Sequence, residues 1–255
     1  MARRPHSQVF LHDAGIITRI VALVPRNPEH PVVEIGPGSG AITRALVSAG
    51  HTVRAVEIDA GLADGIARLD PAVQVVTGSI LDYAPRDLVP PPARIVGALP
   101  YHLSGAILRW LADGADDIAT AVLVLQAEVV DRMGAPPGCR TRGLLSVILQ
   151  SVYDVKPVFR IPPGAFVPRP QVWSRVVVLT RQAGGPSVVS CRPMWDVARA
   201  VFRHKRKMIR AGILDDYGAE ACRRCAEAGV DLTLRAERLS LAEFETLATA
   251  LTRGA

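Results

Sequence analysis

Apolar and polar positions alternate in two rhythms along the first two-thirds of the chain. Short runs rich in Val and Ile predict strands, and they occupy residues 31–35, 51–58, 73–77, 94–97 and 119–125. Apolar residues at helical spacing predict helices at residues 16–24, 41–49, 61–69, 104–112 and 128–133. Asp13 stands where it can cap the first helix. Strands that alternate with helices predict an α/β fold with a parallel, doubly wound sheet.

The alternation ends near residue 150. Two later strands, at 152–159 and 172–180, flank a Pro-rich loop, and a turn-rich linker follows at 182–187. Beyond it, apolar spacing predicts three helices, at residues 193–212, 218–228 and 239–252. We therefore predict two domains, 1–183 and 184–255, the second small and all-helical.

Composition narrows the class of protein. The chain has 255 residues, 49% of them apolar, which excludes a mostly disordered chain. No apolar run approaches the roughly 18 residues that span a bilayer, and no apolar signal core follows the first eight residues. Four cysteines are too few for a disulfide framework, and Cys222 and Cys225 have no second pair to complete a metal site. We expect a soluble cytoplasmic protein without a metal or a membrane partner.

A glycine-rich turn is the sharpest local motif. Residues 34–40 read Glu-Ile-Gly-Pro-Gly-Ser-Gly, after a predicted strand and at the start of a predicted helix. Gly36, Gly38 and Gly40 let the backbone turn tightly and approach a ligand closely. Glu57 lies 21 residues after Gly36, at the end of the second strand, where a carboxylate accepts hydrogen bonds from both hydroxyls of a ribose. The spacing resembles that of class I S-adenosylmethionine (SAM)-dependent methyltransferases.

A second motif follows the fourth predicted strand. Pro100 restricts Leu99 to an extended conformation, which can aim the Leu99 carbonyl outward, and Tyr101 can present its ring at the same place. In an open parallel sheet this strand end faces the ligand crevice. A carbonyl acceptor beside an aromatic face suits a flat base with an exocyclic amine.

These blocks, in this order, resemble the ribosomal RNA adenine N6-dimethyltransferases, the KsgA and Erm enzymes. The resemblance runs from about Ser7 to Leu179 and is carried by residues 7–11, 34–40, 56–59, 99–101, 125–130, 143–147 and 165–174. It implies a Rossmann-like class I SAM-dependent methyltransferase sheet, SAM as cofactor, and methyl transfer to an adenine N6 of ribosomal RNA. The expected partner is ribosomal RNA or a ribosomal subunit, and the expected state is a monomer. Such methylation affects ribosome maturation or antibiotic sensitivity.

The resemblance also assigns residues to roles. The catalytic set that it implies is Ala98, Leu99, Pro100 and Tyr101. The cofactor set is Gln8, Leu11, Gly36, Gly38, Gly40, Glu57, Ile58, Ser79 and Ile80. The RNA set is Phe166, Arg169, Arg203, Lys205, Arg206, Lys207 and Arg210, where Phe166 resembles a second base-sandwiching aromatic and residues 202–210 resemble a basic helix.

Three positions depart from the family pattern. Val9 and Ser79 stand where the family usually has Asn and Asp, and Ala98 replaces the catalytic Asn. Ala98 therefore supplies no side-chain acceptor for an adenine amino group. Losing one well-placed polar contact lowers a rate by roughly 10²–10³. The sequence thus predicts a slow adenine enzyme or a changed acceptor.

Two alternatives stay open at this stage. A small-molecule methyltransferase on the same scaffold would explain the altered Ala98 position, and His102 beside it could serve a substrate hydroxyl. A non-enzymatic RNA-binding or assembly factor would explain Val9 and Ser79. The intact glycines and Glu57 argue against this last reading, because a chain that no longer binds SAM has little need of them.

Overall fold

The computed structural model describes residues 9–27, 29–204 and 206–252, and they form two compact units. Unit 1 consists of residues 1–130 and 154–181, and unit 2 of residues 131–153 and 182–255. The sequence-predicted boundary near residue 183 lies close to the end of unit 1. Unit 2 also takes in residues 131–153, because helix α7 (Leu144–Val152) packs against α8 (Val188–Arg203).

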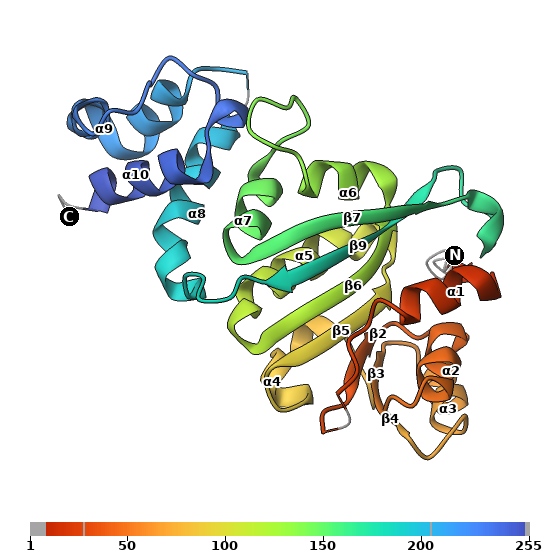
Figure 1. Cartoon of the computed structure of the whole chain (residues 1–255). Coiled ribbons are helices and arrows are strands. Elements are labelled where there is room, and N and C mark those ends of the chain that lie inside the picture. The colour runs from red at the N-terminus through yellow and green to blue at the C-terminus, as the bar shows by residue number, and fades with distance from the viewer. Residues whose placement is uncertain (1–8, 28, 205, 253–255) are drawn as a thin grey trace, which may run out of the picture. The chain divides into compact units, whose positions relative to one another are not determined.

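Unit 1 is built on a mostly parallel sheet, as the alternation predicts. In the described part of the chain its strand order is β4-β3-β2-β5-β6-β9-β7 (Figure 1). These strands are β2 (Val32–Ile35), β3 (Val53–Glu57), β4 (Val73–Thr77), β5 (Ala93–Ala98), β6 (Ile118–Gln126), β7 (Tyr153–Ile161) and β9 (Ser174–Arg181). The pairs from β4 to β6 are parallel, and β9 runs antiparallel to β6. The order reverses between β2 and β5, and this reversal is where ligands bind in open α/β sheets.

Helices connect these strands and cover the sheet. In the view of Figure 1, α5 lies behind the strands, and α2 and α3 lie beside β3 and β4. The helices that begin in unit 1 are α1 (Ala14–Val21), α2 (Ala41–Ser48), α3 (Ala60–Ala67), α4 (Pro85–Leu88), α5 (Ser104–Asp113) and α6 (Ala127–Met133). Asp13 caps α1 as predicted, because its Oδ1 accepts a hydrogen bond from the Ile16 N–H over 2.9 Å. Val33, Ile95 and Leu123 in the central strands are fully buried, as expected for strands covered on both faces.

A short pairing that the sequence pattern does not predict joins distant parts of unit 1. Strand β1 (Phe10–Leu11) runs antiparallel to β8 (Phe166–Val167), with Leu11 opposite Phe166. Strands of two residues carry no periodicity, so only the folded chain reveals this pair. It places the Phe10 ring against the glycine-rich turn.

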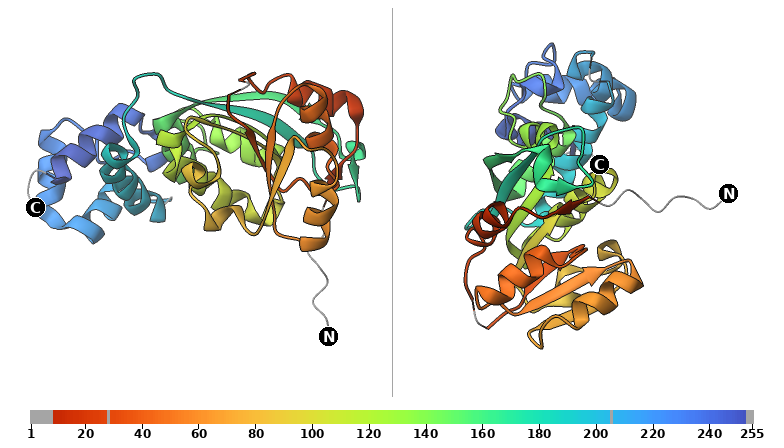
Figure 2. Two further views of the ribbon diagram at one scale, coloured as in Figure 1. Left: turned by 90° about the horizontal axis from the view of Figure 1, so that it is seen from below. Right: turned by 90° about the vertical axis from the view of Figure 1, so that its right-hand side faces the viewer.

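Unit 2 is helical, as predicted. Helices α8, α9 (Ile209–Glu227) and α10 (Leu241–Thr252), cyan to blue in Figure 2, pack against one another, and α8 also packs against α7. Trp195 of α8 is fully buried, and its Nε1 donates to the Ser151 hydroxyl over 2.9 Å. The rings of Phe202 and Phe244 stack with their centroids 6.1 Å apart.

One predicted helix is wrong in its extent. The sequence pattern favours a single helix over 193–212, but α8 ends at Arg203 and α9 begins at Ile209. Backbone bonds to a distant segment explain the break, because the Ile209 and Arg210 N–H groups donate to Leu234 and Leu232 at 2.8 and 3.2 Å. The basic stretch therefore crosses a helix–helix junction and is not the single helix that the resemblance suggests. Among the described residues, no helix is long and apolar enough to cross a membrane.

Candidate cofactor and substrate site

The glycine-rich turn has a backbone that only glycine adopts easily. Gly36, Gly38 and Gly40 have φ values of 64°, 55° and 79°, in the left-handed region. A Cβ at Gly38 would come within 2.7 Å of the Phe10 ring, and a Cβ at Gly40 within 2.7 Å of the Leu69 side chain. A Cβ at Gly36 would meet no atom within 4 Å. The turn is thus packed on two sides, and the space in front of Gly36 is open.

Glu57 ties the end of β3 to this turn. Its carboxylate is buried, with Oε2 accepting from the Gly38 N–H at 3.1 Å and Oε1 from the Asp59 N–H at 3.0 Å. Each carboxylate oxygen has a second lone pair, so both keep capacity for a ligand hydroxyl. The neighbouring Ile58 side chain is 66% exposed, which is a large apolar surface beside the carboxylate.

A second carboxylate, which sequence reasoning did not single out, belongs to the strand that leads into this turn. Glu34 of β2 is 1% exposed, and its Oε2 accepts from the Thr43 hydroxyl of α2 at 2.7 Å. Burial raises the pKa of Glu34 to about 7, and the negative charge of Glu57 adds to this rise. The signal in the sequence was an acid inside an otherwise apolar strand. Glu34 and Thr43 bridge the strand and the helix that the glycine turn connects.

The predicted cofactor residues Ser79 and Ile80 follow β4. The Gly78 N–H donates to the Glu57 carbonyl over 2.8 Å, which joins the ends of β4 and β3. Ser79 comes next, and its Oγ accepts from the Leu81 N–H at 3.2 Å, while Ile80 is buried. Among the other predicted cofactor residues, Leu11 of β1 is buried, and Gln8 lies outside the described residues.

The second motif sits at the end of β5, next to β2. Ala98 closes the strand opposite Val124 of β6, and the Leu99 N–H donates to the Val124 carbonyl over 3.0 Å. A Cβ at Gly97 would come within 2.8 Å of the Ile35 backbone oxygen, so β5 and the strand that leads into the glycine turn are in close contact. The two motifs therefore meet at the reversal of strand order.

Hydrogen bonds hold the residues after Ala98 in place. The Pro100 carbonyl accepts from the Ser104 hydroxyl and from the Leu103 N–H, each over 3.1 Å. The Tyr101 hydroxyl bonds the hydroxyl of Ser174, at the start of β9, over 3.1 Å. Ser174 is fully buried, so this bond fixes the far end of a half-buried Tyr101 side chain.

The structure places the predicted RNA residues of unit 1 in different environments. Phe166 is 5% exposed and belongs to the hydrophobic core together with Leu11. Its predicted contact with a base stays a prediction, and the buried ring would have to be uncovered first. Arg169, three residues on, is exposed.

The predicted basic residues of unit 2 fall into two groups. Arg203 and His204 face acids of α9, with Arg203 2.7 Å from Asp216 and the His204 Nε2 3.0 Å from Asp215. The second group lines a hollow of about 550 Å³, formed by Arg206, Lys207, Met208, Arg210, Ala211, Leu214, Thr233 and Arg235. Lys205 lies outside the described residues. Sequence reasoning missed Arg235 and Thr233, because they come from a separate segment before α10.

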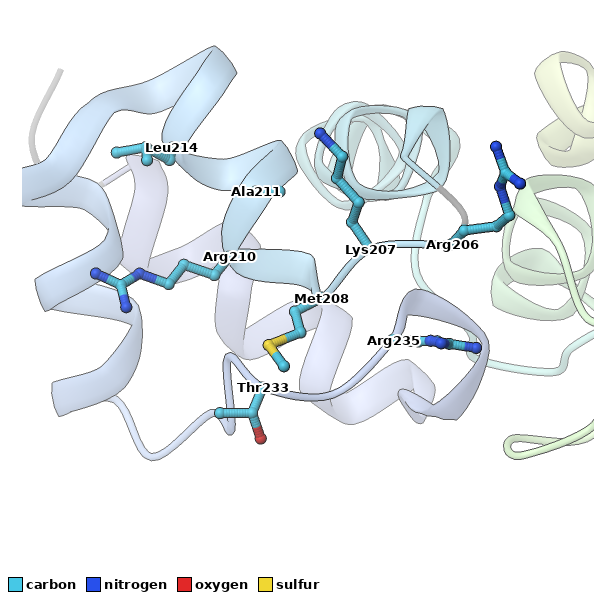
Figure 3. A pocket seen from close by; sticks show the side chains of 8 residues that line it. All are labelled: Arg206, Lys207, Met208, Arg210, Ala211, Leu214, Thr233 and Arg235. Carbon is cyan, nitrogen blue, oxygen red and sulfur yellow. The ribbon is translucent and has the colours of Figure 1, made fainter.

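The cationic side chains along this hollow do not converge on one point. Figure 3 shows Arg206 and Arg235 at one end, Arg210 extending toward the other end, and Met208 between them. Within the described ranges, no carboxylate lies within ion-pair distance of Arg206, Lys207 or Arg210. The two thiols of the C-x-x-C pair, Cys222 and Cys225, are buried, and no metal-binding group of His, Cys, Asp and Glu occurs in the part that the structure describes.

Comparison with known proteins gives a consistent result over the whole chain. Residues 1–253 match the family described as ribosomal RNA adenine dimethylase. The ribosomal RNA small subunit methyltransferase A of Dichelobacter nodosus is 36% identical over 248 residues, which is 96% of this chain and 93% of that protein. The protein of the same name from Xanthomonas campestris pv. campestris is 39% identical over 258 residues, or 97% and 95% of the two chains.

Solved structures agree with these sequence relatives. The 23S rRNA methyltransferase ErmE superposes with a TM-score of 0.73 at 27% identity, covering 95% of this chain and 99% of that one. A dimethyladenosine transferase from Plasmodium falciparum shares the fold, with a TM-score of 0.77 at 19% identity over 93% and 95% of the two chains. The match over residues 1–253 and the relatives of 36% and 39% identity show that the chain belongs to the ribosomal RNA adenine dimethylase family.

Proposed function

We propose that this chain transfers a methyl group from SAM to the N6 atom of an adenine in ribosomal RNA. The observation that carries the proposal is the meeting of two motifs at the reversal of strand order. The glycine turn with Glu57 lies on one side and Ala98 to Tyr101 on the other, with Gly97 packed against the Ile35 backbone between them. The family match over residues 1–253 supports the reaction class.

The residues at the turn fit SAM. When bound, SAM supplies an electrophilic methyl group on a sulfonium. The open space in front of Gly36 would admit the ligand to the backbone, and the free lone pairs of the Glu57 carboxylate would accept the two ribose hydroxyls. The exposed Ile58 and the Ser79–Ile80 segment would flank the adenine ring of the cofactor.

The end of β5 would hold the target base. An adenine extruded from its stack would lie against the Tyr101 ring, which the Ser174 hydroxyl holds in position. The Leu99 carbonyl would accept a hydrogen bond from the N6 amino group and orient its lone pair toward the methyl group. Positioning of this kind contributes on the order of 7–11 kcal/mol to lowering the barrier. With SAM held by the glycine turn and Glu57, its sulfonium would supply the methyl group to N6, and the proton that N6 loses would pass to water.

Ala98 lowers the expected rate without removing the reaction. The family resemblance places an Asn at this position, whose side-chain oxygen would be a second acceptor for the amino group. Ala98 leaves one acceptor, the Leu99 carbonyl, so the chain is expected to be slower by roughly 10²–10³ than an Asn-bearing version. The comparisons give no support to a small-molecule methyltransferase or to a non-enzymatic assembly factor.

The test is transfer of labelled methyl from SAM to unmethylated small ribosomal subunits and to naked ribosomal RNA. The natural chain is assayed beside Ala98→Asn, and the labelled nucleoside is identified after digestion. We expect label on adenine N6 from both proteins, with a higher kcat for Ala98→Asn. Glu57→Ala is the control, because losing the ribose acceptor should weaken SAM binding.

Two outcomes of this assay would contradict the proposal. If neither protein labels RNA while both bind SAM, the ribosomal RNA proposal is wrong and small hydroxylated or aminated substrates come next. If the natural chain labels RNA and Ala98→Asn does not exceed it, the assignment of position 98 as the missing acceptor is wrong.

Unit 2 would contribute RNA backbone binding. The cations around the hollow are spread apart, which suits successive phosphates of a strand better than one small anion (Figure 3). Met208 and Leu214 also line the hollow, and they are 55% and 45% exposed. Arg206, Lys207, Arg210 and Arg235 are the side chains that we assign to this contact.

A further inference from the structure

The segment between β8 and β9 carries a large aromatic side chain that the proposed reaction does not use. Trp173 directly precedes β9, and its side chain is 52% exposed. Val167 at the end of β8 and Val172 in this segment are also exposed, at 59% and 43%. An exposed indole next to the candidate site is a candidate ligand contact, because Trp combines a large apolar face with a polar N–H group.

Hydrogen bonds anchor Trp173 at the edge of the sheet that carries the candidate site. The N–H of Ala127, the residue after β6, donates to the Trp173 carbonyl over 2.9 Å. The next residue, Ser174, bonds the Tyr101 hydroxyl. β9 lies two strands from β5, which is about 10 Å at ordinary strand spacing. The backbone of Trp173 is therefore fixed close to the end of β5, while its ring stays accessible.

The charge of this part of the chain indicates what kind of ligand the ring meets. From Val155 to Gln182 the sequence has no Asp or Glu and five basic residues, which are Lys156, Arg160, Arg169, Arg175 and Arg181. Arg169 is exposed and belongs to the same segment as Trp173. Arg181 is paired with Asp116 over 3.1 Å, so Arg169 is the cation that we associate with Trp173. An accessible aromatic ring in the same segment as an exposed Arg suits an unpaired nucleobase, because the ring stacks on the base and the guanidinium attracts its phosphates.

We propose that Trp173 is a stacking platform for an unpaired base that flanks the target adenine in RNA. This rests on the proposed function, which places the target adenine at Tyr101. Stacking works with every base, so Trp173 would select RNA whose target lies in an unpaired stretch and would read little of its sequence. The site is separate from the ring of Tyr101, which serves the target base itself.

Intrinsic tryptophan fluorescence can report on RNA binding at Trp173. It has three Trp residues, of which Trp195 is fully buried and Trp110 is half-buried with its Nε1 bonded to the Tyr83 carbonyl over 2.7 Å. Titration with a short single-stranded RNA should therefore quench fluorescence that comes from Trp173. We expect Trp110→Phe to retain the quenching and Trp173→Phe to lose it. Duplex RNA of the same sequence should quench little.

Binding of fluorescently labelled single-stranded RNA measures how much Trp173 contributes to RNA affinity. Trp173→Ala should weaken binding roughly 5- to 150-fold, the range for loss of one base–aromatic stack. Trp173→Phe keeps an aromatic face and should stay within a few-fold of the natural chain. Val189→Ala, which shortens a side chain of α8 that is 78% exposed, is the matched control and should bind normally. Unchanged melting temperatures would show that all the variants fold.

The result that overturns the inference is Trp173→Ala binding single-stranded RNA as tightly as the natural chain, or quenching that duplex RNA reproduces. The inference and the proposed function fail in different ways. If ribosomal RNA is methylated and Trp173→Ala leaves its KM unchanged, the stacking platform is wrong and the function stands. If no adenine is methylated but Trp173→Ala still loses single-stranded RNA, the function is wrong and the platform stands.

Discussion

At the scale of single residues, the site depends on two carboxylates in different environments. Glu57 accepts hydrogen bonds from two backbone N–H groups, whereas Glu34 accepts one from the Thr43 hydroxyl and is buried in β2. Desolvation opposes the charged form of Glu34, and this is why its pKa rises to about 7. Near neutral pH, the carboxyl group of Glu34 is therefore protonated in part of the molecules and ionised in the rest.

This environment predicts a pH-dependent stability. The pKa of Glu34 in the folded chain, about 7, lies above its ordinary value of 4.5, so the folded state binds the proton more tightly. The resulting contribution to stability is complete below pH 4.5 and is lost as the pH rises to about 7. Glu34→Gln does not titrate, so relative to the natural chain it should gain about 3 kcal/mol of unfolding free energy between pH 4 and pH 8.

Chemical denaturation at several pH values tests this expectation. The charged and polar groups around Glu34 are Thr43 and Arg44 of α2 and Glu57 of β3, and all of them stay intact in the variant. Glu245→Gln, which removes one carboxylate from the exposed face of α10, is the control for the loss of a negative charge. If the free energy of unfolding changed with pH in the same way for Glu34→Gln and the natural chain, the raised pKa of Glu34 would be wrong.

At the scale of elements, close contacts between backbones decide which glycines are needed. Gly212 of α9 is buried, and a Cβ there would come within 2.7 Å of the Ala200 carbonyl of α8. Gly65 lies in the exposed face of α3, and a Cβ there would meet nothing within 4 Å. Glycine at position 212 thus allows α8 and α9 to pack closely, whereas glycine at position 65 has no role in packing.

The same substitution should therefore have opposite effects at these two positions. Gly212→Ala forces α8 and α9 apart and should lower the free energy of unfolding by about 1–3 kcal/mol. Gly65→Ala should raise it by about 0.5–1 kcal/mol, because alanine loses less conformational entropy in a helix. Thermal and urea denaturation of the two variants measure both signs. Stabilisation by Gly212→Ala would show that the two helices do not pack as closely as described.

At the scale of the whole molecule, we expect RNA affinity to depend on the excess of positive charge and on where the unpaired cations lie. The chain carries a formal net charge of +6. Arg203 and Arg223 are engaged by acids, whereas Arg206, Lys207 and Arg210 face the hollow in unit 2 without such partners among the described residues. Phosphate binding at these positions would make RNA affinity fall steeply with salt.

The salt dependence of RNA binding tests this distribution. Arg206→Ala combined with Arg210→Ala should reduce the slope of log affinity against log salt by about one for each lost phosphate contact. Arg223→Ala is the matched control, because Glu220 and Glu227 already neutralise that guanidinium. Equal slopes for the double variant and the natural chain would remove unit 2 from the RNA interface.

The sequence by itself determined the alternation of strands and helices, the glycine turn and the carboxylate at the end of the second strand. These features are local, since side-chain periodicity and left-handed backbone conformations depend on a few neighbouring residues. Only the tertiary structure decided the pairing of β1 with β8, the burial of Phe166 and the break between α8 and α9. It also placed Arg235 and Arg206 around the same hollow. It brought Ser174, the residue after Trp173, into hydrogen-bond contact with Tyr101. Each of these depends on contacts between residues far apart in the chain, where burial and backbone hydrogen bonds outweigh local preference.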